Sequence, residues 1–218
     1  MEFKIFVYLQ NDRRFVNRFM KAHKDHRIHS IIEAAINEFV ERGYAGTSME
    51  SIAKRAVLSK GGLYHHFSSK AEILFAVNQK FLEPIMELAG RIEANHSVVD
   101  GLNQYIHDYF SYWSQHQREL KLYFLTMNES FSNQQIMELY RESTQTIFAY
   151  FGGLFQKGQA DGEFKPCNAH ARSVALVSCL DGYLGYLLID PLLDTATIEM
   201  EIQQVFIQSL LLKNKGGS

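Results

Sequence analysis

Residues 43–74 read GYAGTSMESIAKRAVLSKGGLYHHFSSKAEIL, and this stretch decides the fold. Thr47-Ser48-Met49-Glu50 has the form of a capping box, in which Thr47 bonds the amide of Glu50 and starts a helix that runs to about Arg55. Ser59 is placed to cap a second short helix that ends near Phe67. Ser69-Lys70-Ala71-Glu72 repeats the box and starts a longer helix. The spacing predicts two short helices joined by a tight turn.

A third short helix precedes this pair. From Ile28 the apolar residues recur every three or four positions, and Gly43 follows as a C′ glycine. None of these helices is long enough to be stable alone, so they must pack on one another. The apolar residues that hold the pair together are Ile52, Ala53, Leu58 and Leu63. This pattern is typical of a helix-turn-helix.

The same stretch resembles the DNA-binding domain of the TetR family of bacterial transcriptional regulators. The resemblance spans residues 27–74 and rests on Gly-Tyr after the first helix, Thr at the start of the second, Ser-Lys-Gly before Leu-Tyr, and His-Phe followed by Ser-Lys. It implies an all-α protein whose N-terminal helix-turn-helix is joined through a shared helix to a C-terminal helical ligand-binding and dimerisation bundle. It also implies a ligand-responsive regulator, most often a repressor, that binds a palindromic double-stranded operator as a homodimer.

The resemblance assigns DNA-binding roles to nine residues. Lys60, Gly61, Gly62 and His65 would face base edges, and Tyr64 and His66 would contact the backbone. The other three are the cap Ser59 and two residues, Thr47 and Lys70, that would each face a phosphate. Helix N-termini attract phosphate, which agrees with these roles. Plainer interpretations remain open: Thr47 as a cap alone, Tyr64 and His66 as packing residues, and Lys70 as a solvated lysine.

Two positions depart from the family pattern. Val57 stands in the turn where many relatives have glycine, and a β-branched residue is unfavourable at positive φ. The turn therefore either avoids that conformation or is strained. Gly62 stands beside Gly61 and weakens the recognition helix.

Composition sets broader limits. The chain has 218 residues, 46% of them hydrophobic, and only 3 prolines, which suits a folded protein with long helices. Residues 1–70 carry 12 basic and 7 acidic side chains, whereas the other 148 residues carry 10 basic and 17 acidic ones. Only the N-terminal part therefore has the positive charge that favours binding to a polyanion. Cys167 and Cys179 are expected in one helix, too far apart to pair, which fits a reducing cytoplasm. No membrane span is expected.

The expected domains are an N-terminal extension (1–26), the helix-turn-helix (27–74) and a rear domain (75–213). The extension carries Arg13, Arg14 and further basic residues, which could form a DNA-binding arm or be a disordered segment. In the rear domain, Pro84 should bend the shared helix, and a clean apolar stripe follows from Leu102 to Trp113. Further helices are expected over 118–130, 133–159, 168–189 and 195–213.

The rear domain holds more aromatic residues than a tight bundle needs, although ordinary core packing explains many of them. The alternative is an aromatic-walled pocket for a small apolar or aromatic effector. Its candidate residues are Tyr105, Tyr109, Trp113, Phe124, Asn128 and Phe148. The last two helices are apolar on more than one face, which predicts a dimer interface. Its candidates are Gly182, Gly185, Ile202 and Phe206.

Other functions find less support in the sequence. It has no Gly-rich phosphate loop, no metalloprotease or zinc pattern and no nucleophile elbow, so neither an enzyme nor a cofactor is expected. His23, His26 and His29 are too widely spread around a helix to form a metal site. A helical interaction protein that does not bind DNA remains the main alternative.

Overall fold

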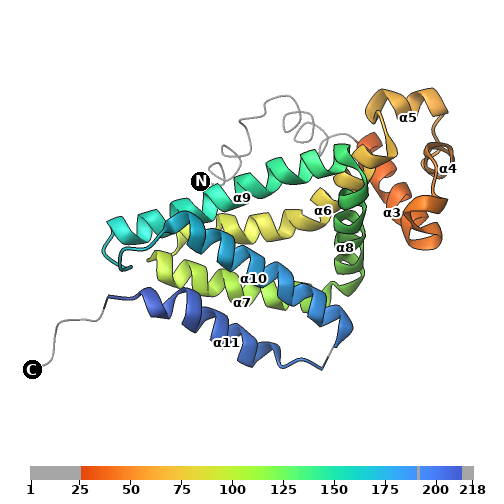
Figure 1. The fold of residues 1–218 in the computed structure, drawn as a ribbon. Coiled ribbons are helices and arrows are strands. Elements are labelled where there is room, and N and C mark those ends of the chain that lie inside the picture. The colour runs from red at the N-terminus through yellow and green to blue at the C-terminus, as the bar shows by residue number, and fades with distance from the viewer. Residues whose placement is uncertain (1–25, 191, 213–218) are drawn as a thin grey trace, which may run out of the picture. The chain divides into compact units, whose positions relative to one another are not determined.

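The computed structural model describes residues 26–190 and 192–212, and every regular element in these ranges is a helix (Figure 1). The predicted all-α class is therefore confirmed. The predicted basic side chains at 13–24 lie outside the described residues. The elements are α3 (His26–Gly46), α4 (Met49–Arg55), α5 (Lys60–His66), α6 (Lys70–Gly90), η1 (Ile92–Ala94), α7 (Val98–Gln115), α8 (Gln117–Ser132), α9 (Gln134–Ala160), α10 (Ala169–Ile189), α11 (Thr195–Phe206) and η2 (Gln208–Leu210).

The described chain forms two compact units, and three helices contribute to both. The N-terminal unit comprises 26–83 and 121–142, and the C-terminal unit comprises 84–120, 143–190 and 192–212. The first division falls inside α6 at Pro84, later than the expected boundary at residue 74. Most of α8 and the start of α9 belong to the N-terminal unit, which no sequence signal indicated.

The N-terminal unit has its own apolar core. Because helical residues four positions apart share a face, α3 buries Ile31, Ala35 and Phe39 as one stripe. Ile52 of α4 and Leu63 of α5 are fully buried against the same core. Further buried members come from α6, α8 and α9 and include Leu74, Val77, Leu122 and Ile136. Helix α3 has 21 residues and is longer than the short helix that the sequence predicted, whereas α4 and α5 have 7 residues each and are stabilised by packing, as predicted.

The turn between α4 and α5 adopts a left-handed backbone conformation that is unfavourable for a β-branched residue. Val57 has φ 57°, and its side chain is 86% exposed. Its N–H donates to the carbonyl of Lys54, and the N–H of Leu58 donates to that of Ala53, which is a Schellman ending for α4. Of the two outcomes left open by the sequence, the structure shows the strained one.

Replacing Val57 with glycine is expected to stabilise the protein by about 1 kcal/mol, because a left-handed backbone is unfavourable for a β-branched residue and free for glycine. The exposed valine side chain contributes little packing that could be lost. Urea unfolding at fixed protein concentration measures the change. Val57→Ala serves as the control and should gain less, since alanine keeps the Cβ. Equal stabilities for all three proteins would show that the turn is not strained.

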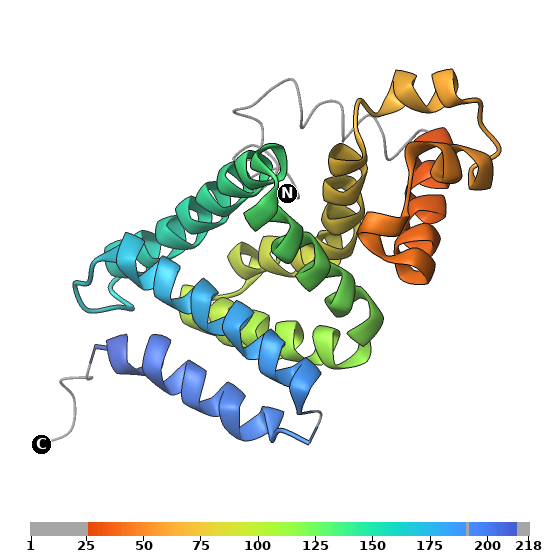
Figure 2. The same ribbon diagram turned by 45° about the vertical axis from the view of Figure 1, so that its right-hand side comes forward.

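The C-terminal unit is built around α7. Its predicted stripe is buried from Leu102 to Trp113, which confirms that part of the sequence analysis. Both carboxylate oxygens of Glu163 accept amide hydrogens at the start of α7, from Val98 and Val99 at 3.0 Å each. Helix α11 packs against α7 and beside α10 (Figure 2).

Helix α11 is shorter than predicted. It ends at Phe206, and η2 follows, whereas the sequence suggested a helix to residue 213. Beyond η2 the chain instead bonds to the segment before α10, where an isolated antiparallel bridge joins Phe164 and Leu211 and the N–H of Lys165 donates to Leu210. These long-range backbone bonds override the local helical pattern.

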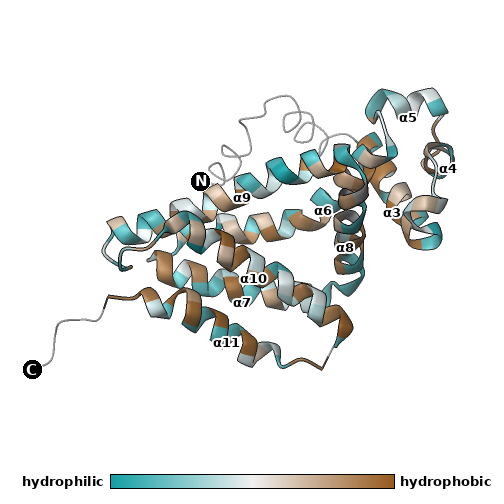
Figure 3. Cartoon of the chain, in the orientation of Figure 1, coloured by the Kyte–Doolittle hydropathy of each residue, from teal (hydrophilic) through white to brown (hydrophobic). Residues whose placement is uncertain are grey.

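Helix α10 carries hydrophobic residues along much of its length (Figure 3). One face buries Leu176, Leu180, Leu184 and Leu187, and the other exposes Tyr186 and Ile189. By length and composition alone, α10 could cross a membrane, which the sequence analysis did not expect. The core helix of a folded protein has the same composition. Cys167 precedes α10 and does not share a helix with Cys179 as expected, and both thiols are free.

Candidate nucleic-acid interface

The start of α4 differs by one residue from the prediction. Ser48, not Thr47, is the N-cap: its hydroxyl accepts from the N–H of Ser51, and the Ser51 hydroxyl accepts from the N–H of Ser48. The Thr47 side chain is buried and donates to the carbonyl of Gly43 at 2.8 Å. Gly43 has φ 67°, which breaks α3 and turns that carbonyl toward Thr47. The predicted cap at Thr47 was wrong, because the Thr47 hydroxyl already bonds the carbonyl at the kink and does not cap α4.

Lys70 lies at the same corner, with its ammonium group turned onto the protein. Nζ donates to the backbone carbonyls of Tyr44 and Thr47 and lies 4.2 Å from the centre of the Tyr44 ring. Partial burial lowers the pKa of Lys70, and Glu129 of α8 opposes that shift. Lys70 therefore ties the end of α3 to the start of α6. A substitution here would loosen the corner as well as remove a charge.

Helix α6 starts with a variant of the predicted box. The Ser69 hydroxyl accepts from the N–H of Glu72, as predicted. The Glu72 carboxylate reaches one residue further back and accepts from both the N–H and the hydroxyl of Ser68.

Helix α5 presents one face to the core and the other to solvent. The Ser59 hydroxyl accepts from the N–H of Gly62, so the predicted cap is confirmed. A Cβ at Gly62 would lie 3.2 Å from that hydroxyl, whereas a Cβ at Gly61 would meet nothing within 4 Å. The space beside the cap thus favours glycine at 62, a reason that the sequence alone did not show.

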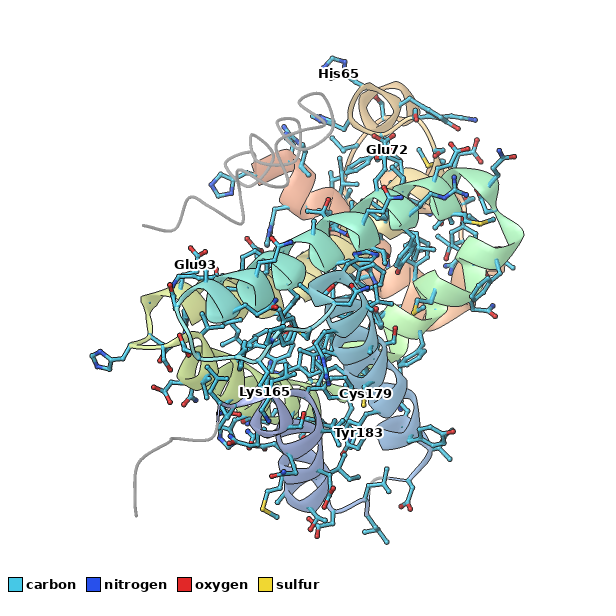
Figure 4. All side chains as sticks on the ribbon, turned by 60° about the vertical axis from the view of Figure 1, so that its left-hand side comes forward. His65, Glu72, Glu93, Lys165, Cys179 and Tyr183 are labelled. Atoms are coloured by element: carbon cyan, nitrogen blue, oxygen red, sulfur yellow. The ribbon has the colours of Figure 1, made fainter. Side chains whose placement is uncertain are left out.

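The outward face of α5 carries the predicted side chains. Leu63 is fully buried and fixes the orientation of the helix, while Tyr64 is 45% exposed. His65 is exposed and projects outward (Figure 4), and its ring packs edge-on against that of His66. Lys60 forms an ion pair with Glu50 of α4, at 2.5 Å between Nζ and Oε1. Hydroxyl, imidazole and ammonium groups on one exposed helix face suit recognition of phosphate and base edges.

Other charges near this face were not singled out in the sequence. Arg55 donates to the buried Glu38 at 2.7 Å and to Glu41 at 2.8 Å, so it fastens α4 to α3. The hydrogen bond with Arg55 lowers the pKa of Glu41. Lys54 is exposed and has no ion-pair partner among the described residues. It is a further candidate for contact with phosphate.

The six candidate ligand-binding residues are divided between the two units. Tyr105, Tyr109 and Trp113 are buried in the C-terminal unit, and Phe148 is half-buried there. The other two lie in the N-terminal unit, where Phe124 is half-buried and Asn128 is exposed. Within the C-terminal unit the aromatic rings touch one another, since Tyr105 lies 5.2 Å from Phe151 and 5.9 Å from Tyr109 between ring centres.

An acidic residue that sequence reasoning missed lies among these rings. The Tyr109 hydroxyl donates to Asp181 Oδ1 at 3.0 Å. Burial raises the pKa of Asp181 to about 6, and the hydrogen bond from Tyr109 opposes that shift. Burial and the nearby Asp181 also raise the pKa of Tyr105. The sequence did not predict a polar group at this place on α10, because a single aspartate in a helix is most often exposed to solvent.

Asp181→Asn is expected to stabilise the protein above pH 6. The folded-state pKa of about 6 exceeds the ordinary 3.8, so the native state holds the proton more tightly and stability falls as the pH rises between these values. Each unit of difference between the folded and unfolded pKa is worth about 1.4 kcal/mol, so asparagine should raise the free energy of unfolding by about 2–3 kcal/mol at pH 8. Below pH 4 it should change this free energy little, because it keeps the acceptor for Tyr109. Urea unfolding at both pH values measures this. The exposed Asp100→Asn is the control, and an equal change for Asp181→Asn at both pH values would contradict the assignment.

The four predicted dimer residues are not equivalent. Gly182 is exposed, and a Cβ there would meet nothing within 4 Å. Gly185 and Phe206 are half-buried, and the Phe206 ring faces the guanidinium of Arg172 at 5.9 Å. Ile202 is only 5% exposed, so it belongs to the core of its own protomer. The exposed apolar residues of α10, α11 and the segment between them are Tyr186, Ile189, Leu192, Met200 and Val205.

Helix α5 is a short, capped helix that packs its buried face beside α4 and turns polar groups outward, and this is the arrangement of a helix-turn-helix. Residues 31–77 match the family model described as "Bacterial regulatory proteins, tetR family". Residues 31–77 of this chain therefore form a DNA-binding domain of the kind found in TetR-family regulators.

Similar proteins agree with this assignment. The uncharacterized HTH-type transcriptional regulator YhgD of Bacillus subtilis is 24% identical over 139 residues, which is 63% of this chain and 72% of that protein. The HTH-type transcriptional activator FasR of Mycolicibacterium smegmatis is 43% identical over 63 residues, 29% of each chain. The crystal structure of FadR from Bacillus subtilis in complex with stearoyl-CoA has a TM-score of 0.66 and 19% identity, and covers 84% of this chain and 98% of that one.

Proposed function

We propose that this regulator acts in the cytoplasm as a homodimer that binds a palindromic operator through α5 of each protomer. The observation that carries the proposal is the orientation of α5. Its buried Leu63 and the cap at Ser59 turn Lys60, Tyr64 and His65 outward together. A recognition helix needs this arrangement to place side chains in the major groove.

We propose the following roles for individual residues. We assign base contacts to Lys60, Gly61, Gly62 and His65, because they lie on α5 and Gly61 leaves space for close approach. Backbone contacts fall to Tyr64 and His66, with Lys54 added. At the start of α4 the exposed Ser48 replaces the buried Thr47. The third donor of the Lys70 ammonium is available to a phosphate, since two donors already bond carbonyls.

The second apolar face of α10 supports the homodimer. Large apolar side chains that stay exposed on neighbouring helices indicate a surface that a partner covers. A copy of the same chain presents the same surface, and an isologous pair matches the symmetry of a palindrome. Gly182 lies on this face and would let a partner helix come close.

The C-terminal unit is the proposed effector site. Tyr105, Tyr109 and Phe148 supply aromatic surface, and Asp181 adds a polar group that could orient an apolar or aromatic effector. Helix α6 connects the two units covalently, because its residues 70–83 belong to one and 84–90 to the other. An effector would release DNA only by binding the DNA-incompetent arrangement more tightly. The proposal includes repression and no enzymatic activity.

A gel-shift titration with the DNA upstream of the protein's own gene tests this function. We expect one retarded complex that stearoyl-CoA, the ligand in the FadR structure, or another apolar compound from a screen dissociates. Linkage requires that the operator weaken effector binding by the same factor, which calorimetry measures with and without DNA. Equal effector affinities in both cases would exclude the coupling. Absence of any DNA complex would favour an interaction protein instead.

A further inference from the structure

We propose that Glu50 sets the sequence discrimination of this protein. It holds the Lys60 ammonium on non-specific DNA and shares that ammonium with a base on the cognate site. The inference rests on the proposed function of α5. Glu50 is the second residue of α4 and Lys60 is the first residue of α5, so the ion pair bridges the two helices of the helix-turn-helix. Both side chains remain more than half exposed, at 67% and 58%. The pair therefore lies where DNA would reach it.

The pair stays charged at neutral pH. Its hydrogen bond lowers the pKa of Glu50 and raises that of Lys60. Lys60 thus reaches DNA as a cation whose charge is already balanced by a carboxylate on the same surface. The acid itself would repel phosphate.

Non-specific binding depends almost entirely on phosphate neutralisation and counterion release. A lysine paired with a carboxylate contributes little to phosphate neutralisation, and so little to non-specific affinity. On a cognate site the situation differs, because a lysine has three donors and can bond guanine O6 or N7 while keeping one donor on Glu50. The carboxylate can also accept from the amino group of cytosine. Glu50 therefore lowers affinity for all DNA, but lowers it least where a G·C pair faces α5.

Glu50 is the acid of the N-terminal unit that shares a surface with the start of α5. The other ion-paired acids of the described unit are engaged elsewhere: Glu38 and Glu41 hold Arg55, and Glu33 holds Lys80. Lys54 on α4 provides a contrast, since it has no ion-pair partner among the described residues and suits phosphate alone. The contribution of Lys60 to DNA binding therefore depends on which base pair faces it.

The test compares wild type, Glu50→Gln, Lys60→Met and the double variant. Fluorescence anisotropy measures affinity for a site selected from random duplexes by the wild type and for a scrambled duplex, over a range of salt concentrations. For Glu50→Gln we expect scrambled DNA to bind about tenfold tighter, with a salt slope steeper by about one. The selected site should tighten by less than about threefold, so the specificity ratio falls. In the Lys60→Met background, Glu50→Gln should still tighten binding to both duplexes, because it removes an acid that repels phosphate, but it should leave the ratio of the two affinities unchanged.

Glu33→Gln is the matched control, because it removes an acid from α3 and frees Lys80 in the same unit. Equal tightening of both duplexes by Glu50→Gln, or a fall in the specificity ratio that persists in the Lys60→Met background, would overturn the proposal. A wild type that does not distinguish the two duplexes would instead refute the proposed function itself. Circular dichroism verifies that the exposed substitution leaves the helices intact.

Discussion

Gly182→Leu is expected to give a folded monomer that binds operator DNA far more weakly than the dimer does. A side chain at this exposed position meets nothing within 4 Å in its own protomer, so the fold should tolerate it. In a dimer the same side chain would push the partner helix away. Loss of the second half-site contact should weaken operator binding by about 100-fold or more, because the two recognition helices no longer act together.

Light scattering at micromolar concentration, combined with anisotropy on the operator, measures both effects. Gly153→Leu is the control, since a Cβ at this glycine of α9 also meets nothing within 4 Å. It should leave the dimer intact. A Gly182→Leu protein that stays dimeric with unchanged affinity would move the interface away from α10.

Alanine substitutions on α5 are expected to separate two kinds of contact. Tyr64→Ala should weaken binding to every sequence by about tenfold, because it removes a backbone contact. Lys60→Ala should weaken operator binding by about 10- to 100-fold and relax the preference at one base pair, as removal of a specific base contact does. Lys60 is 58% exposed and Tyr64 is 45% exposed, and neither belongs to the buried core, so stability should change little.

Anisotropy on the operator and on variants with single base-pair changes distinguishes these outcomes. Lys121→Ala removes an equal charge from an exposed position of α8 in the same unit and serves as the control. If Lys60→Ala and Lys121→Ala had the same effect on all duplexes, the recognition face would have to be reassigned.

Sequence reasoning predicted the features that local chemistry determines. The caps at Ser59 and Ser69 and the buried stripe of α7 follow from short-range hydrogen bonds and helical periodicity. The resemblance to the TetR family implied that Lys60, Tyr64 and His65 face DNA, and the structure leaves all three exposed on α5. Sequence reasoning also identified Val57 as a conflict between residue type and turn, which the positive φ shows.

The features it missed depend on contacts between distant residues. The Thr47 hydroxyl bonds Gly43 because the chain kinks there, and Lys70 reaches carbonyls 26 and 23 residues away. Asp181 is half-buried and bonded to Tyr109 because α10 packs against α7. Ile202 matched the periodicity of an interface residue, yet it faces its own core. Periodicity shows that a helix has an apolar face, but tertiary packing decides what that face covers.

The central claim is that the face of α5 reads DNA sequence. Its most direct test is the ratio of wild-type affinities for a duplex selected from a random pool and for the same duplex scrambled, at physiological salt. We expect the selected site to be palindromic and to bind at least about 1,000-fold tighter, within the range of specific regulators. Equal affinities for the two duplexes would contradict the account.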